Sequence, residues 1–186
     1  MRKVALGMQV SLDGFVATDD GGLDWAFAHF EPKLLGAIEE RLSQLDVVLM
    51  GRHNYEEQAA TWPHMRDDPI GEIMNSVQKI VFSRTLETLE WENARLADGT
   101  PEEVVARLKN EEGGDIGVSG GATLAGRLAA AGLIDEYRLA VHPVALGKGM
   151  RLFTAPIELE LVDSVRFDSG ITLNTYRPAV REPAHA

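Results

Sequence analysis

The sequence predicts an α/β fold built on one sheet that is mostly parallel and ends in an antiparallel hairpin. Short apolar runs typical of buried strands alternate with helical patterns up to about Gly132, and this alternation is typical of a parallel sheet. Beyond Gly132 the chain is rich in strands, and residues 168–170 (Asp-Ser-Gly) suit the turn of a hairpin. The 186 residues suit one domain, which we expect over residues 1–178 with a flexible tail at 179–186.

The first half of the chain is expected to supply three strands and two helices. The strands are predicted at residues 3–10, 46–51 and 79–84. Pro32 fits the first turn of a helix, and apolar residues recur behind it at helical spacing up to residue 45. Asp68 is a favourable N-cap residue directly before Pro69, so a second helix is predicted to begin there.

The second half begins with a strong helix signal. Thr100 suits the N-cap, Pro101 suits the first helical position, and Glu103 completes the pattern of a capping box. Another helix is expected at residues 122–131, with Gly132 as its left-handed cap. Further strands are predicted at residues 115–119, 136–146, 159–167 and 171–177.

Composition and charge exclude several classes of function. The formal net charge of −11 repels phosphate backbones, so no nucleic-acid partner is expected. The absence of cysteine excludes disulfides, thiolate catalysis and cysteine-ligated metals, and the five histidines show no metal-binding spacing. No apolar run is long enough to span a bilayer, and the N-terminal residues read as a strand and not as a signal peptide. We therefore expect a cytoplasmic protein without a metal or a membrane partner.

Adjacent glycines, Gly120 and Gly121, join a predicted strand to a predicted helix. Glycines there let the backbone approach a bulky ligand, and the helix N-terminus aims N–H groups at the same place. The competing interpretation is a turn in which glycine only permits tight packing. The late position and spacing of the glycines do not fit a Rossmann fingerprint, and Arg127 and Leu128 replace the Lys-Ser/Thr of a phosphate-binding loop.

Two other predicted strands end in residues that suit an anion. Gly51, Arg52 and His53 follow one strand, and Ser83 and Arg84 end the next. Parallel sheets bind ligands at the carboxyl ends of their strands, so these residues are expected at one edge. Together with the adjacent glycines, they predict a phosphate or dinucleotide site there.

These motifs, in this order, resemble dihydrofolate reductase. Residues 9–17 (Gln-Val-Ser-Leu-Asp-Gly-Phe-Val-Ala) and 142–153 are more similar to the reductase domain of bacterial riboflavin biosynthesis, and the resemblance covers residues 2–177. It implies a dihydrofolate reductase-like, three-layer α/β/α fold with a mainly parallel twisted sheet and an antiparallel C-terminal hairpin. It also implies NADPH as hydride donor and a homodimer. No deaminase portion and no zinc signature accompany it.

The resemblance assigns cofactor roles to the strand-end residues. Gly51, Arg52, His53 and Asn54 would hold the pyrophosphate and nearby phosphates. Ser83 and Arg84 would face the adenosine 2′-phosphate. Gly120 and Gly121, joined by a cis peptide, would lie against the cofactor. Backbone N–H groups at the start of the following helix would bind the pyrophosphate; these belong to Ala122, Thr123 and Leu124.

The substrate side offers fewer candidates. Asp13, at the end of the first strand, is a candidate catalytic acid, although Asp-Gly is also an ordinary turn pair. Asp24 and Trp25 are candidate substrate-binding residues, with Trp25 stacking on a flat heterocycle or, alternatively, packing in the core. Glu31 precedes Pro32 instead of lying within a helix, so it is not assigned as the acid of a folate reductase.

The combined expectation is an NADPH-dependent reductase, riboflavin-pathway-like or pterin-like, that acts on a small heterocyclic or carbonyl-containing molecule. The alternative is a non-catalytic dimeric protein of the same fold that binds a nucleotide or another small molecule.

Overall fold

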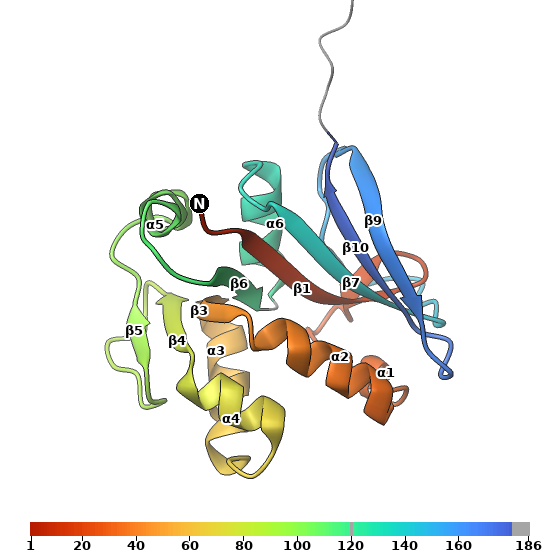
Figure 1. Ribbon diagram of the computed structural model, residues 1–186, viewed down its shortest axis with the longest axis horizontal. Helices are drawn as coiled ribbons and strands as arrows, with labels where there is room; N and C mark the ends of the chain where they lie inside the picture. The colour runs from red at the N-terminus through yellow and green to blue at the C-terminus, as the bar shows by residue number, and fades with distance from the viewer. Residues whose placement is uncertain (120, 180–186) are drawn as a thin grey trace, which may run out of the picture.

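The computed structural model describes residues 1–119 and 121–179, and eight of the strands in this part of the chain form one sheet. The strand order is β5-β4-β3-β6-β1-β7-β10-β9 (Figure 1). The parallel strands are β1 (Val4–Ser11), β3 (Leu45–Gly51), β4 (Gln78–Phe82), β5 (Ala94–Leu96), β6 (Asp115–Ser119) and β7 (Glu136–His142). The strands β9 (Leu159–Arg166) and β10 (Thr172–Pro178) pair antiparallel and close one edge. The predicted α/β class is therefore confirmed.

Helices cover both faces of this sheet, which confirms the predicted three layers (Figure 1). On one face lie α5 (Pro101–Lys109) and α6 (Ala122–Ala130), and on the other α2 (Pro32–Leu42), α3 (Arg52–Ala59) and α4 (Pro69–Ser76). The core under α5 and α6 includes Leu6 and Leu49, both fully buried. Each such side chain stabilises the fold by about 2 kcal/mol through burial.

The predicted helix boundaries are confirmed where a capping residue fixes the end of the helix. The Asp68 carboxylate accepts a hydrogen bond from the Gly71 N–H at 2.9 Å and caps α4. Thr100 and Glu103 form the full capping box of α5. Gly132 follows α6 with a φ of +66°, as a left-handed cap requires.

Two strands end earlier than the sequence predicts. β4 stops at Phe82, because the Ser83 hydroxyl accepts hydrogen bonds from the N–H groups of Thr85 (3.1 Å) and Leu86 (2.9 Å) and turns the chain. β7 stops at His142 and not at residue 146, because the next residue is Pro143, which has no N–H for the ladder.

Several short elements were not predicted. They are β2 (Phe15–Ala17), which pairs antiparallel with β8 (Met150–Arg151), the short helix α1 (Asp24–Phe27), the 3₁₀ turn η1 (Trp62–His64) and the strand β5. Helix α3 was also missed. Its only buried residue is Tyr55, so it shows none of the apolar periodicity by which helices are recognised. Within the described part of the chain, no helix has the length and apolar character needed to cross a membrane.

Candidate active site

A cleft of about 420 Å³ lies at the carboxyl edge of the central strands. The β1 strand contributes its Gly7–Gln9 segment to the lining, and α3 contributes four polar side chains. The junction of β6 and α6, the segment from β2 to Leu23, and Met150 contribute the rest. The residues used below are Gln9, His53, Asn54, Gln58, Ser119, Gly121, Ala122 and Thr123. The structure thus brings together two motifs that lie about seventy positions apart in the sequence, at the edge where such sheets bind ligands.

Gly121 lies in the wall of the cleft, next to Asn54. Its φ is +74°, a conformation that side chains of L residues rarely adopt. A Cβ atom added there would lie 3.8 Å from the Asn54 Cβ, which is ordinary van der Waals contact. The backbone angle, and not crowding, therefore requires glycine. Gly120 and the expected cis peptide between Gly120 and Gly121 lie outside the described residues.

The first turns of two helices border the same cleft. Helix α3 begins directly after Gly51 and α6 directly after Gly121, and neither N-cap has a side chain to occupy the first N–H groups. Asn54 in the first turn of α3, and Ala122 and Thr123 at the start of α6, all line the cleft. Each helix dipole places about half a positive charge at its N-terminus, so this wall suits an anionic group such as a pyrophosphate.

The predicted arginines lie just beyond the ends of β3 and β4, outside the lining of the cleft. Gly51 is in register with Phe82, so Arg52 and Ser83 follow neighbouring strand ends. Arg52 contacts the Glu56 carboxylate at 3.4 Å and the His53 ring nitrogen Nε2 at 3.0 Å. Arg84 is exposed and makes no hydrogen bond or ion pair with any residue that the structure describes.

Only part of the predicted cofactor set lines the cleft itself. His53, Asn54, Gly121, Ala122 and Thr123 do so. Gly51, Arg52, Ser83 and Arg84 lie beyond its lining, and the Leu124 side chain is packed in the core.

Asp13 fastens a loop and does not line the cleft. Its carboxylate accepts hydrogen bonds from the Ser11 hydroxyl (2.7 Å) and from the N–H groups of Gly147 (2.7 Å) and Leu146 (3.1 Å). The Ser11 bond, followed by the Gly147 bond, lowers the pKa of Asp13 to about 2. A carboxylate that is ionised near neutral pH has no proton to donate. The structure therefore favours the turn role of Asp13 over the catalytic role that the sequence suggested.

Asp24 and Trp25 lie beside the cleft without lining it. Asp24 is exposed, whereas Trp25 is half-buried and meets the His142 ring edge-on, with the ring centroids 5.2 Å apart. Leu23, the residue before them, does line the cleft. The packing against His142 favours the core role of Trp25 over stacking on a substrate.

A side-chain network that the sequence did not reveal holds Asn54 in place. The Gln58 amide donates to the Asn54 carbonyl oxygen (2.8 Å) and to the Ser119 hydroxyl (2.9 Å). The Trp62 indole N–H donates in turn to the Gln58 carbonyl oxygen at 3.1 Å. Gln58 lies four residues after Asn54, so the contact would follow from helical spacing once α3 is known.

Gln9 and His142 form a second unforeseen pair. His142 is fully buried, and its Nε2 lies 2.7 Å from the Gln9 carbonyl oxygen. Burial, followed by the nearby His29, lowers the pKa of His142 to about 4, so the ring is neutral near pH 7. A neutral ring has one N–H, and this contact with a carbonyl oxygen places it on Nε2. The Gln9 NH₂ group, a hydrogen-bond donor, takes no part in this contact, and Gln9 lines the cleft.

Comparison with known proteins places the chain in a family. The model of the RibD C-terminal domain matches residues 2–173. The uncharacterized protein YyaP of Bacillus subtilis (strain 168) is 33% identical over 182 residues, which cover 94% of this chain and 94% of the relative.

Two solved structures share the fold. A putative riboflavin biosynthesis protein from Shewanella sp. PV-4 aligns with a TM-score of 0.74 and 23% identity, covering 96% of this chain and 99% of that one. A diaminohydroxyphosphoribosylaminopyrimidine deaminase/5-amino-6-(5-phosphoribosylamino)uracil reductase from Thermotoga maritima aligns with a TM-score of 0.69 and 19% identity, covering 96% of this chain and 57% of that one. These matches confirm the dihydrofolate reductase-like fold. With the match over nearly its whole length, the chain belongs to the RibD C-terminal domain family.

Proposed function

We propose that the protein is an NADPH-dependent reductase that transfers a hydride to a small heterocyclic or carbonyl-containing substrate. The observation that carries this proposal is the meeting of two uncapped helix N-termini, of α3 and α6, in a cleft at the carboxyl edge of the sheet. Membership of a family that includes reductases supports it.

The distribution of charge in the cleft favours one placement of NADPH, with its pyrophosphate at the N-termini of α3 and α6. Asp19, Asp20 and Glu57 also line the cleft, and Lys148 pairs with Asp19 at 3.1 Å. Positive potential is therefore concentrated at the helix N-termini, where the pyrophosphate would bind. Beyond the cleft lining, Arg52 would help to hold the pyrophosphate, and Ser83 and Arg84 would face the adenosine 2′-phosphate. When bound, NADPH would supply the hydride.

The chain's own residues would orient the substrate and exclude water. Gln9, fixed by His142, offers a donor to a substrate carbonyl oxygen or ring nitrogen. Val16, Leu23 and Met150 form an apolar wall that shields the reacting atoms from solvent.

A thermal-shift comparison of NADPH with NADH tests the cofactor. Saturating a specific site at about 100 times its Kd adds roughly 2.7 kcal/mol of stability. We expect a clear rise in Tm with NADPH and a smaller one with NADH, because only NADPH carries the 2′-phosphate. If neither nucleotide changes the Tm, the cofactor assignment is wrong.

A second candidate is a non-catalytic, dimeric binding protein of the same fold. Two observations favour it: Asp13 is ionised and fastens a loop, and the Glu31 carboxylate accepts the Ser169 N–H at 2.6 Å. Both acids considered from the sequence are therefore engaged in the structure. This candidate predicts ligand binding without NADPH oxidation across a panel of pterins, pyrimidines and quinones, followed by NADPH absorbance.

A further inference from the structure

A chain of hydrogen bonds runs from the buried core beside α4 toward the cleft, and it keeps one direction throughout. The buried Trp91 donates its indole N–H to the Asn75 side-chain carbonyl oxygen at 2.8 Å. The Asn75 NH₂ group donates in turn to the Trp62 backbone carbonyl oxygen at 2.8 Å. The Trp62 indole N–H then donates to the Gln58 side-chain carbonyl oxygen at 3.1 Å. Each residue therefore passes a donor on to the next one in the direction of the cleft.

Trp62 fixes which way the Gln58 amide faces. An indole nitrogen carries one donor and no acceptor, so the Gln58 atom that it meets must be the carbonyl oxygen. The Gln58 NH₂ group is then the end that donates to the Asn54 side-chain oxygen (2.8 Å) and to the Ser119 hydroxyl (2.9 Å). A reversed amide would set the Gln58 NH₂ group against the indole N–H, and two donors would face each other without an acceptor.

The direction of these bonds leaves Asn54 and Ser119 as donors. Their side-chain oxygens accept from Gln58, so Asn54 keeps its NH₂ group and Ser119 keeps its hydroxyl hydrogen. No residue that the structure describes accepts a hydrogen bond from either group. Both residues line the cleft. This part of the cleft wall therefore suits a ligand group that only accepts hydrogen bonds.

Gln58 also ties together the two elements that border the cleft. It lies on α3, with Asn54 in the first turn of the same helix, whereas Ser119 ends β6, 61 positions further along the chain. Hydrogen bonds in one chain polarise one another, and bonds to an ionised acceptor are stronger than bonds to a neutral one. The uncapped N-termini of α3 and α6 favour an anion as well. An anionic oxygen is therefore the acceptor that fits this wall.

We propose that Gln58 and Trp62 are positioning residues for the cofactor, which set Asn54 and Ser119 as a pair of donors to one oxygen of the NADPH pyrophosphate. This inference rests on the proposed reductase function and adds to it two residues outside the cofactor motifs. Trp62 does not line the cleft, so it acts on the cofactor only through the Gln58 amide.

Two variants change the direction of the bonds. Gln58→Glu keeps an acceptor for the Trp62 N–H but has no donor, so the hydrogens of Asn54 and Ser119 turn to the new carboxylate. Isothermal titration should show the Kd for NADPH rising at least about tenfold. Trp62→Phe keeps an aromatic ring and frees the Gln58 amide to reverse, so the Kd should rise about threefold. The affinity for adenosine 2′-phosphate, which carries no pyrophosphate, should stay the same in both variants.

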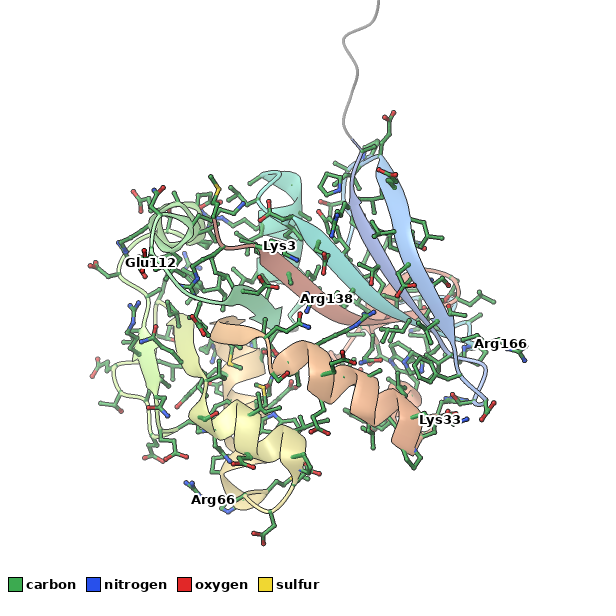
Figure 2. The ribbon with its side chains drawn as sticks, viewed as in Figure 1. Lys3, Lys33, Arg66, Glu112, Arg138 and Arg166 are labelled. Carbon is green, nitrogen blue, oxygen red and sulfur yellow. The ribbon has the colours of Figure 1, made fainter. Side chains whose placement is uncertain are left out.

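Two controls separate this effect from loss of structure and from charge. Trp91→Phe removes the more deeply buried indole bond, but the Trp62 carbonyl oxygen still fixes the Asn75 amide, so stability should fall while both affinities stay. Arg66→Gln lowers the net charge by one unit, as Gln58→Glu does. Arg66 lies on the outside of the molecule near α4 (Figure 2), so its loss should leave the Kd for NADPH unchanged.

The failures of the two proposals are distinguishable. Tight NADPH binding that Gln58→Glu leaves unchanged would overturn the positioning role and keep the reductase. Equal losses for both ligands, or a loss in Trp91→Phe as large as in Trp62→Phe, would show a merely structural role. Inorganic pyrophosphate is a separate probe. If the wild-type protein binds it in a way that Gln58→Glu abolishes, but does not bind NADPH, the donor pair stands and the reductase is rejected. Binding of neither would overturn both proposals.

Discussion

At the scale of single residues, the polar groups of the site take their properties from burial and from distant partners. His142 is neutral because it is enclosed, and Asp13 is strongly acidic because three donors surround its carboxylate. Two of those donors lie 133 and 134 positions further along the chain. Partners so far along the chain cannot be predicted from a sequence pattern. The sequence therefore supported a catalytic acid and a turn residue at Asp13 equally well.

His142 should make stability depend on pH. Its folded pKa of about 4 lies below the ordinary histidine value of 6.5, so the unfolded state binds the proton more readily. Stability therefore falls as the pH drops from about 6.5 toward 4. Between pH 7 and pH 5 the loss should be about 2 kcal/mol. Urea unfolding at the two pH values measures it. His142→Asn should flatten the dependence, whereas the exposed control His53→Gln should not; an equally steep dependence in His142→Asn would refute the assignment.

Amide hydrogen exchange can test whether the Asp13 carboxylate holds the loop at Leu146 and Gly147. In Asp13→Ala the N–H groups of Leu146 and Gly147 lose their acceptor, so their exchange should accelerate strongly while the sheet stays protected. Asp98→Ala, at an exposed site away from this loop, is the control and should change neither amide. Unchanged protection at both amides in Asp13→Ala would show that the carboxylate does not hold the loop.

At the scale of elements, the sequence correctly predicted the helix boundaries that are fixed by interactions between residues close together in the chain. The capping box of α5 and the glycine stop of α6 involve residues a few positions apart, and both were correct. Helix α3 was missed because its exposed, polar residues show no periodicity, although its start after Gly51 shapes the cleft. The motifs that meet in the cleft could be named from the sequence, but Gln58 and His142 act through contacts that only the packed fold creates.

The junction of β6 and α6 is predicted to depend on glycine for its backbone angle. Gly121→Ala should lower the free energy of unfolding by about 1–2 kcal/mol, because φ there is +74° and the alanine Cβ strains that conformation. Chemical denaturation measures the change. Gly36→Ala, in the exposed middle of α2 with open space around it, is the matched control and should raise stability by about 0.5–1 kcal/mol. A shift of the same sign and size at both positions would contradict the conformational argument.

At the scale of the whole molecule, the two edges of the sheet differ. The β5 edge is a strand of only three residues. The β9 edge is eight residues long, and most of its side chains are exposed, including Leu161 (54% exposed), Val162 (47%) and Val165 (42%). A long edge strand with exposed apolar side chains is a ready template for pairing with another chain. The homodimer implied by the family resemblance would cover this edge.

The protein is therefore expected to form a homodimer through β9. Light scattering should give twice the mass of the 20.3 kDa chain, and Val162→Lys should shift the mass toward that of the monomer, because it places a charge in the apolar contact. Met65→Lys, at an exposed apolar residue beside η1, is the control and should remain dimeric. The Val162→Lys protein must keep the circular dichroism spectrum of the wild-type protein, which shows that it has lost the dimer and not the fold. A monomeric wild-type protein would show that there is no dimer. A Val162→Lys protein that stays fully dimeric would show that the dimer contact lies elsewhere.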